Sequence, residues 1–463
     1  MTATELDRTT SAAPPQTTPE GMSALLADDV ERYRAAFDAD PRLMVSQNAV
    51  TETALDKVAL NRRVVTGIDH SMSHLLDDHQ ATNQKRSGRC WLFAGLNVLR
   101  GAVATELGVK DFEFSQSWLF FWDKLEKANY FLESMIATAG RDIDDRTVAH
   151  LLDDPINDGG QWNMFVALIN KYGVVPKFAM PETESSSNTR WLNRSLQSLL
   201  RQGARDLRAV SDQDPKQIAG CKDRIMAGIY RVLAVHLGTP PETFIWQWTD
   251  AERTFHREGE MTPREFADKY ITTPLDEYVC LVHDPRESSP VGRTFTVEYL
   301  GNVADAPPVT YLNVDIEVLR QVTQESIVDG EPVWFGCDTG KQSNADLGYW
   351  DAELYDYGAV YDVDFTLDKA GRLLHRDSLM THAMVFTGVD LHDGRPRRWR
   401  VENSWGPEKA DKGFWTMTDS WFGEHVFEVA VHRSRLPAEL RNQLAEEPIV
   451  LPAWDPMGAL AGR

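Results

Sequence analysis

The first residue whose setting points to chemistry is Cys90, in the stretch QKRSGRCWLF. It follows a Ser-Gly turn and begins an apolar pattern with Leu92, Leu96 and Leu99 at helical spacing, so we expect it in the first turn of a buried helix. The free N–H groups and the dipole of a helix N-terminus favour a thiolate. Since a single cysteine is more often a small buried hydrophobe, Cys90 is a candidate nucleophile only if a histidine lies beside it.

The candidate partner is His382, which begins the stretch HAMVFTGVDLHDGRPRRWRVENSWG. In a hairpin, the residue numbers of any two directly opposite residues add up to the same value. Pairing His382 with Asn403 therefore centres the turn between His392 and Asp393, inside LHDG. Asn403 could then hold the imidazole with its other nitrogen directed at the sulfur, as a Cys-His catalyst requires. Bulges could shift this register by one or two residues. The alternative is a core histidine and a turn asparagine.

Two further features fit the same chemistry. The side-chain NH₂ of Gln84 and the backbone N–H of Cys90 could both donate to the oxyanion of a tetrahedral intermediate, although a solvated loop glutamine is the alternative. Gly159 and Gly160 precede a helical pattern in NDGGQWNMF, and their missing side chains would let an extended peptide lie against the backbone. An ordinary turn explains the two glycines nearly as well.

Other kinds of site have weaker support. His70 and His74 have the i, i+4 spacing of two metal ligands but lack the glutamate of an HExxH motif, so we predict no metal. No glycine-rich phosphate-binding or dinucleotide-binding motif is evident, and we predict no cofactor. The formal net charge of −22 argues against nucleic acid as the principal partner.

Cysteine usage and hydropathy bear on the compartment. The chain has 4 cysteines, and the nearest two, Cys280 and Cys337, are 57 positions apart, which gives neither a metal knuckle nor a disulfide framework. The first residues lack a basic segment followed by an apolar run, and no apolar stretch reaches about 18 residues. We therefore expect a reduced, cytoplasmic protein without a membrane span.

The elements around these residues change along the chain. Residues 1–23 are rich in Thr, Ala and Pro and are predicted to be a flexible tail. A helix is expected from Cys90 to a stop at Gly108, and residues 181–300 show charged helical patterns without a catalytic motif, which indicates a mainly helical insertion. After about residue 308 short strands separated by Gly and Asp turns dominate, so the fold class predicted is α+β.

These motifs together resemble the bleomycin hydrolase and aminopeptidase C family of papain-like cysteine peptidases, over residues from about 24 to the end. The resemblance lies in NQKRSGRCWLFAGLNVLR, DGGQWNMFVALINKYGVVPK, THAMVFTG, VENSWG and LPAWDPMGALA. It implies that Cys90 is the nucleophile, His382 the base and then the acid, and Asn403 the residue that orients His382. It further implies Gln84 as oxyanion donor, Trp405 as a shield over the Asn–His hydrogen bond, and Gly159 and Gly160 as partners of the substrate backbone. Core packing is an equally good reading of Trp405.

The same resemblance implies a fold and an assembly. We expect a two-lobed papain-like body, with a helical lobe over residues 24–180, a helical hook over 181–300, a β-rich lobe over 301–450 and a C-terminal arm over 451–463 in the active-site cleft. Members of this family form hexameric barrels whose active sites face an inner chamber. The activity implied is a broad aminopeptidase acting on peptides with a free N-terminus, including amides such as that of bleomycin.

The C-terminal arm is the feature expected to select for a free N-terminus. Its two prolines and Trp454 would hold it extended, and a terminal carboxylate would pair with the substrate's ammonium. The chain runs two residues past Ala461. We therefore expect either that Gly462 and Arg463 are trimmed, so that the carboxylate of Ala461 binds the substrate's ammonium, or that the arm lies farther from the nucleophile and needs no trimming. An endopeptidase of the same fold and a non-catalytic assembly or nucleic-acid-binding protein are the alternative functions.

Overall fold

The computed structural model describes residues 22–76 and 79–461, which divide into two units. The smaller unit contains the described residues up to Leu60 together with Tyr355–Phe365, and the larger unit contains Asn61–Leu354 and the described residues from Thr366 onward. The helices of the smaller unit are α1 (Ala27–Asp38), α2 (Pro41–Glu52), α3 (Leu55–Val58) and α14 (Tyr357–Tyr361). Helices α1 and α2 bury none of their residues. All residues proposed for chemistry that the structure describes belong to the larger unit.

Twelve strands of the larger unit form one sheet. Its order is β14-β5-β6-β4-β13-β7-β10-β11-β12-β9-β8, with β1 paired to β10. The strands are β1 (His74–Leu75), β4 (Tyr278–Val282), β5 (Thr294–Val297), β6 (Tyr311–Asn313), β7 (Val333–Cys337), β8 (Ser343–Asn344), β9 (Tyr349–Trp350), β10 (His382–His392), β11 (Arg395–Glu402), β12 (Phe414–Thr418), β13 (Val426–His432) and β14 (Ile449–Leu451). Strand β10 therefore lies inside the sheet, between β7 and β11.

Helices cover both faces of this sheet. One hydrophobic core joins β7 and β10 to α5, α6, α8, α10 and α11, and a second core joins the other face to α13 and α16. The helices of this unit are α4 (Arg62–Thr66), α5 (Cys90–Leu107), α6 (Gln116–Ala137), α7 (Arg146–Asp153), α8 (Trp162–Tyr172), α9 (Glu184–Ser187), α10 (Arg190–Ala209), α11 (Pro215–Leu237), α12 (Pro263–Tyr270), α13 (Ile316–Val328), α15 (Lys369–Leu374), α16 (Asp419–His425) and α17 (Ala438–Gln443). Short 3-10 turns η1 (Lys177–Ala179), η2 (Leu275–Glu277), η3 (Arg433–Arg435) and η4 (Pro456–Ala461) complete the described elements.

Helix α5 is the predicted helix of Cys90. It begins at Cys90 and ends before Gly108, whose φ of 64° is left-handed and suits glycine. A Cβ at Gly95 would come within 2.7 Å of the Phe165 ring, so glycine allows α5 and α8 to pack closely. The helix is apolar on nearly all sides, which is the pattern of a helix inside a core.

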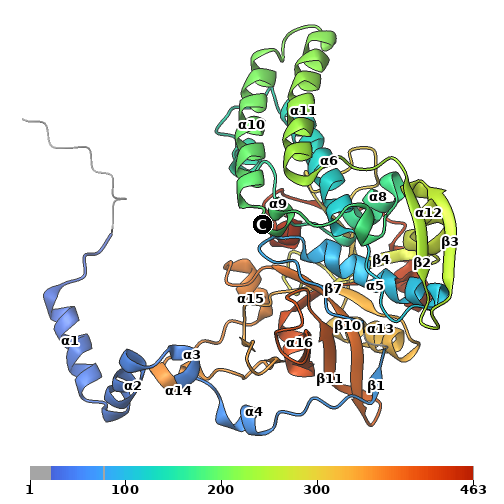
Figure 1. The fold of residues 1–463 in the computed structure, drawn as a ribbon. Coiled ribbons are helices and arrows are strands. Elements are labelled where there is room, and N and C mark those ends of the chain that lie inside the picture. Colours follow the sequence, from blue (N-terminus) through green and yellow to red (C-terminus); the bar gives the residue numbers. More distant parts are fainter. Residues whose placement is uncertain (1–21, 77–78, 462–463) are drawn as a thin grey trace, which may run out of the picture. The chain divides into compact units, whose positions relative to one another are not determined.

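The segment 181–300 differs from the mainly helical expectation at two places. Helices α10 and α11 form a long antiparallel pair that extends away from the sheet (Figure 1). Residues 244–261, however, form the hairpin of β2 (Phe244–Thr249) and β3 (Phe255–Met261), and β4 and β5 belong to the large sheet. The side chains of β2 alternate between buried and exposed at Phe244, Ile245 and Trp246, which is the pattern of a strand.

The predicted hairpin of His382 and Asn403 is present, but its predicted register is wrong. The ladder pairs Val385 with Glu402 and His392 with Arg395, which centres the turn between Asp393 and Gly394. Irregularities between Phe386 and Gly388 and between Asp390 and Leu391 shift the pairing along the way. His382 is opposite Cys337 of β7 instead, and Asn403 lies one residue beyond β11.

Within the described ranges, no helix is both long enough and apolar enough to cross a membrane.

Candidate active site

The thiol of Cys90 lies against the start of strand β10. Cys90 is the first residue of α5 and is 3% exposed. Its Sγ–H donates to the carbonyl of Gly88 at 3.9 Å. Burial raises the pKa of the thiol, while the backbone of Ala383, the neighbour of His382, and the first residues of the helix lie close enough to the sulfur to lower it. The nucleophile predicted from the sequence therefore sits at a helix N-terminus and near the backbone of the residue that follows the predicted histidine.

His382 and Asn403 meet through their side chains. Nε2 of His382 is 2.9 Å from Oδ1 of Asn403, and both residues are buried. An amide oxygen only accepts hydrogen bonds, so Nε2 carries a proton and Nδ1 is the basic nitrogen of the neutral ring. Trp405 covers this pair, with its ring centre 5.1 Å from that of the imidazole.

A buried ion pair fixes Asn403 relative to the helix of Cys90. Nη2 of Arg100, on α5, is 2.5 Å from Oε1 of Glu402, and Nδ2 of Asn97 donates to the same oxygen at 2.8 Å. Glu402 directly precedes Asn403. Helix α5 thus holds both the thiol and the end of the strand that carries the orienting amide.

Gln84 reaches the same place by pairing with the segment after Asn403. Its backbone N–H donates to the carbonyl of Ser404 at 2.8 Å, and its side-chain Oε1 accepts from the Ser404 hydroxyl at 2.6 Å. Its Nε2 donates one hydrogen to the carbonyl of Ser87 at 2.5 Å. The amide has a second N–H on Nε2, which is the group an oxyanion would need.

The two predicted glycines have different surroundings. The N–H of Gly159 donates to Asn157 at 3.1 Å and its carbonyl accepts from Lys127, so its backbone already has partners in the chain. A Cβ at Gly160 would overlap the indole of Trp91, which explains glycine there by packing alone. Of the two, Gly160 is the better candidate to face a peptide.

The end of the chain is anchored beside this site. Asp455 is paired with Arg286 at 2.9 Å, and β14 runs parallel to β5. Leu460 is 2% exposed, and a Cβ built at Gly336 would lie 3.6 Å from it. Gly336 is the register partner of Ala383, so Leu460 packs one strand away from the backbone that contacts the thiol. The backbone of Ala461 is described, while Gly462 and Arg463 lie outside the described residues.

Residues that the sequence did not single out hold the loop before Cys90. Oδ2 of Asp158 accepts from the N–H of Gly88 at 3.0 Å, and its Oδ1 is 2.8 Å from Nζ of Lys124. Burial would raise the pKa of Asp158, but Lys124 and the hydrogen bonds around the carboxylate lower it. Asp158 is the first residue of the stretch DGGQWNMF, but no sequence pattern pairs it with Lys124.

His70 and His74 are not brought together as metal ligands. Nδ1 of His70 lies 2.8 Å from the hydroxyl of Thr416, and Nδ1 of His74 lies 2.9 Å from that of Ser73. Among the residues in the described ranges, no three His, Cys, Asp or Glu side chains are grouped so that they could hold a metal ion.

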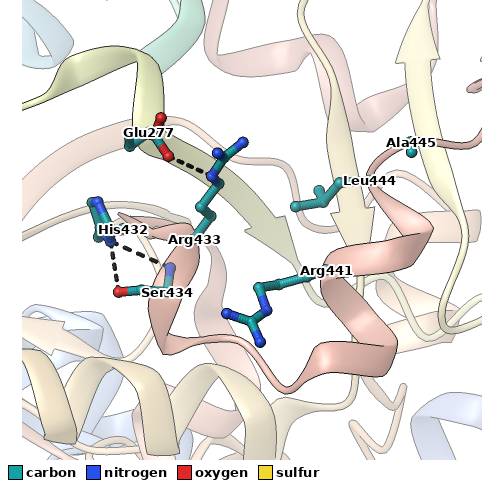
Figure 2. Close-up of a pocket in the computed structure, with 7 residues that line it drawn as sticks. All are labelled: Glu277, His432, Arg433, Ser434, Arg441, Leu444 and Ala445. Carbon is teal, nitrogen blue, oxygen red and sulfur yellow. Dashed lines mark hydrogen bonds and ion pairs between the residues drawn. The ribbon is translucent and has the colours of Figure 1, made fainter.

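Figure 2 shows a surface pocket of about 430 Å³. Arg433 pairs there with Glu277, and Nδ1 of His432 lies 2.7 Å from the hydroxyl of Ser434. None of the sequence-predicted residues is among those that line it, which are Glu277, His432, Arg433, Ser434, Arg441, Leu444 and Ala445.

Burial shifts both members of the thiol–imidazole pair. It raises the pKa of Cys90 to about 11, against the backbone hydrogen bonds at the sulfur, and it lowers the pKa of His382 to about 4, against the Asn403 hydrogen bond. Between these values the pair holds one proton in total, whether as thiol and imidazole or as thiolate and imidazolium. That is the state from which the thiol can attack.

We therefore expect kcat/KM to be kept as pH falls through 6.5, the ordinary pKa of histidine, and to be lost near pH 4, when a second proton binds. Initial rates on an unblocked peptide from pH 3.5 to 7 measure this.

The lowered pKa of His382 also affects stability. As pH falls, the unfolded chain binds a proton at this histidine before the folded chain does, so the free energy of unfolding falls between about pH 6.5 and 4. Thermal unfolding at each pH is the control. An acid limb near 6.5 with the fold intact would contradict the expectation.

A papain-like fold of mixed helices and sheet, with a cysteine at a helix start and, at the start of the neighbouring strand, a histidine held by an asparagine, is that of a cysteine-type peptidase. The chain belongs to the Peptidase C1-like family, whose model matches residues 24–458. It is 41% identical to aminopeptidase C of Listeria monocytogenes over 95% of this chain and 100% of that protein. It is 42% identical to human bleomycin hydrolase over 95% of this chain and 99% of that protein. The crystal structure of PepW from a Lactobacillus superposes with a TM-score of 0.92 at 41% identity, covering 94% of this chain and 99% of that one.

Proposed function

We propose that the protein is a cysteine aminopeptidase, which removes N-terminal residues from peptides through an acyl-enzyme. The observation that carries the mechanism is the 2.9 Å hydrogen bond that holds His382 against Asn403 beside the buried thiol. Relatives named aminopeptidase C and bleomycin hydrolase support the activity.

In the proposed reaction, Cys90 attacks the carbonyl of the first peptide bond while its proton passes to Nδ1 of His382. The imidazolium returns this proton to the amine of the shortened peptide as the C–N bond breaks, which leaves a thioester on Cys90. Water, deprotonated by the same nitrogen, then hydrolyses the thioester and frees the amino acid. Asn403 keeps the ring in the tautomer that both steps need.

The remaining residues bind the oxyanion and the substrate backbone, or shield the catalytic hydrogen bond from water. We assign the free N–H of Gln84 and the backbone N–H of Cys90 to the oxyanion, because both belong to the loop and helix start that surround the thiol. Gly160 would pair with the substrate backbone in preference to Gly159, whose polar groups are already bonded. Trp405 would keep water from the His382–Asn403 hydrogen bond.

The C-terminal arm would set the preference for free N-termini. It is anchored by Asp455 and packs at Leu460 near the thiol, so it would fill the space upstream of the scissile bond. A carboxylate at or just beyond Ala461 would then meet the substrate's ammonium. The proposed trimming of Gly462 and Arg463 falls on residues outside the described ranges.

The test is the product pattern of an unblocked peptide and of its N-acetylated copy, read by mass spectrometry. We expect stepwise loss of N-terminal residues from the first and no cleavage of the second. Internal cleavage of both would indicate the endopeptidase alternative. No cleavage of either by pure, folded protein would indicate the non-catalytic alternative.

We further propose a two-lobed body with a helical hook, a homohexamer and a cytoplasmic location. The separate cores on the two faces of the sheet support two lobes, and the extended pair α10 and α11 supports a hook. The four cysteines are all free, which suits a reducing compartment. Light scattering should give a mass about six times 52.3 kDa, reduced by charge reversals on the outer face of α10 and α11. A fully active monomer would contradict the assembly.

A further inference from the structure

Arg89, the residue before the nucleophile, is a fully buried cation. Its side chain is 0% exposed, and its guanidinium lies 5.1 Å from the ring centres of Phe93 and Phe120. Its two terminal nitrogens bind Glu182 in a fork, at 3.0 and 2.7 Å. Burial would raise the pKa of Glu182, but Arg89 lowers it, so the carboxylate stays charged beside the guanidinium.

Serine hydroxyls hold the carboxylate of this pair. Oε1 of Glu182 accepts from Ser117 at 3.1 Å and Oε2 accepts from Ser186 at 2.7 Å. A buried ion pair gives little net stability compared with well-packed apolar residues, so stability alone is a weak reason for it. What it does provide is a guanidinium with a fixed position and orientation.

The third nitrogen of the guanidinium points to the loop of Gln84. Nε of Arg89 donates to the hydroxyl of Ser87 at 3.0 Å, and that hydroxyl donates to the carbonyl of Gln84 at 2.7 Å. The side chain of Gln84 returns a hydrogen bond to the carbonyl of Ser87. Ser87 and Gln84 thus bond each other in both directions, and Arg89 is connected to them through the Ser87 hydroxyl.

This loop has a conformation that needs support. Lys85 has a φ of 54°, which is left-handed and unfavourable for a residue with a side chain. The loop is held by Asp158 at Gly88 and by Ser404 at Gln84. Between them, the hydroxyl of Ser87 is held by Arg89. Such a strained turn persists only when its surroundings fix it.

We propose that Arg89 is a positioning residue for the oxyanion donor: through Ser87 it fixes the carboxamide of Gln84 at the distance and angle that the tetrahedral intermediate requires. The proposal rests on the oxyanion role of Gln84 in the proposed function. Glu182 contributes by holding the guanidinium of Arg89 in place. Arg89 itself touches neither substrate nor thiol in this role.

The test variant is Arg89→Lys, which keeps a cation for Glu182 but removes the separate Nε–H that Arg89 donates to Ser87. We expect kcat to fall roughly tenfold at unchanged KM, since a small displacement of a catalytic group costs this much or more. Inhibition by an α-amino aldehyde, whose carbonyl adds the thiol to form a tetrahedral hemithioacetal, should weaken by the same factor. Alkylation of Cys90 by iodoacetamide, which forms no oxyanion, should keep its rate within about twofold.

Two variants calibrate this result. Gln84→Ala should show the same signature with a loss of roughly 10²-fold in kcat. Arg320→Lys changes a comparable ion-paired arginine, bound to Asp419 at 3.1 Å on the other face of the sheet, and should alter none of the three readouts. If Gln84→Ala leaves kcat and aldehyde inhibition intact, the oxyanion role assigned under the proposed function is wrong, and this inference fails with it.

With that role intact, two results would overturn the inference itself. One is an unchanged kcat in Arg89→Lys. The other is a loss of alkylation equal to the loss of aldehyde binding, which would mean that the thiol and not the oxyanion donor had moved. Should Arg89→Lys fail to fold, Ser87→Ala removes the bridge and keeps the ion pair. Ser87→Ala should lower kcat and the affinity for the aldehyde severalfold, with the alkylation rate unchanged. If kcat and aldehyde affinity are both normal in this variant, the inference is equally overturned.

Discussion

Replacing Cys90 by alanine or serine should lower kcat on an unblocked peptide by roughly 10⁴-fold or more, because alanine has no nucleophile and a serine hydroxyl is a far weaker one than the thiol. The fold should persist, since either side chain fits the volume of a thiol at a helix start. Circular dichroism and light scattering on the variants check the fold and the assembly. Substantial activity in Cys90→Ala would end the thiol mechanism.

The same prediction can be read from labelling rates. Cys90 and Cys221 are 3% and 6% exposed, so exposure alone would favour Cys221. We expect iodoacetamide to label Cys90 faster nonetheless, because His382 can accept its proton. Cys221→Ala, on α11, is the matched control and should retain full activity. Faster labelling at Cys221 in the native enzyme would contradict activation of Cys90.

Deleting residues 458–463 should convert the enzyme toward endopeptidase activity, with cleavage of N-acetylated peptides that the full chain rejects. A charge-assisted hydrogen bond to the substrate's ammonium is worth roughly 1.5–3 kcal/mol, so kcat/KM on unblocked peptides should also fall by about ten- to a hundredfold. Comparing the two substrates on both enzymes measures the change in preference.

Leu460→Ala is the control for lost packing in this experiment. It removes a buried side chain and should cost roughly 2–5 kcal/mol of stability, yet it keeps the arm and therefore the rejection of blocked peptides. If the arm-deleted enzyme, still folded by its thermal unfolding, rejects N-acetylated peptides as before, then selection for free N-termini lies elsewhere.

The local features of the site could be predicted from the sequence because each has a local physical signal. Helix α5 was marked by apolar spacing and by Gly108, whose left-handed φ ends it. The hairpin of β10 and β11 was marked by the turn sequence between two strand patterns. Its register was missed by one position at the turn, because the bulges at Gly388 and Leu391 depend on pairing with other strands and leave no mark in the spacing.

The supporting contacts could not be predicted, because they join residues far apart in the chain. Arg89 and Glu182 are separated by 93 positions, and either residue alone reads as an ordinary surface charge. Lys124 and Asp158 have the same property. Strands β4 and β5 were missed because they are short, and their membership of the sheet is evident only from their partners β13 and β6.

The burial of α5 on nearly all sides also has a consequence for hydrogen exchange. Its amides lie in the main core, from Trp91 to Val103, and a helix in such a place opens only with the whole domain. Its slowest amides should then exchange with the free energy of global unfolding. Denaturants should therefore not produce a folded population with a misplaced nucleophile, and loss of activity on heating should follow the same transition as loss of the fold.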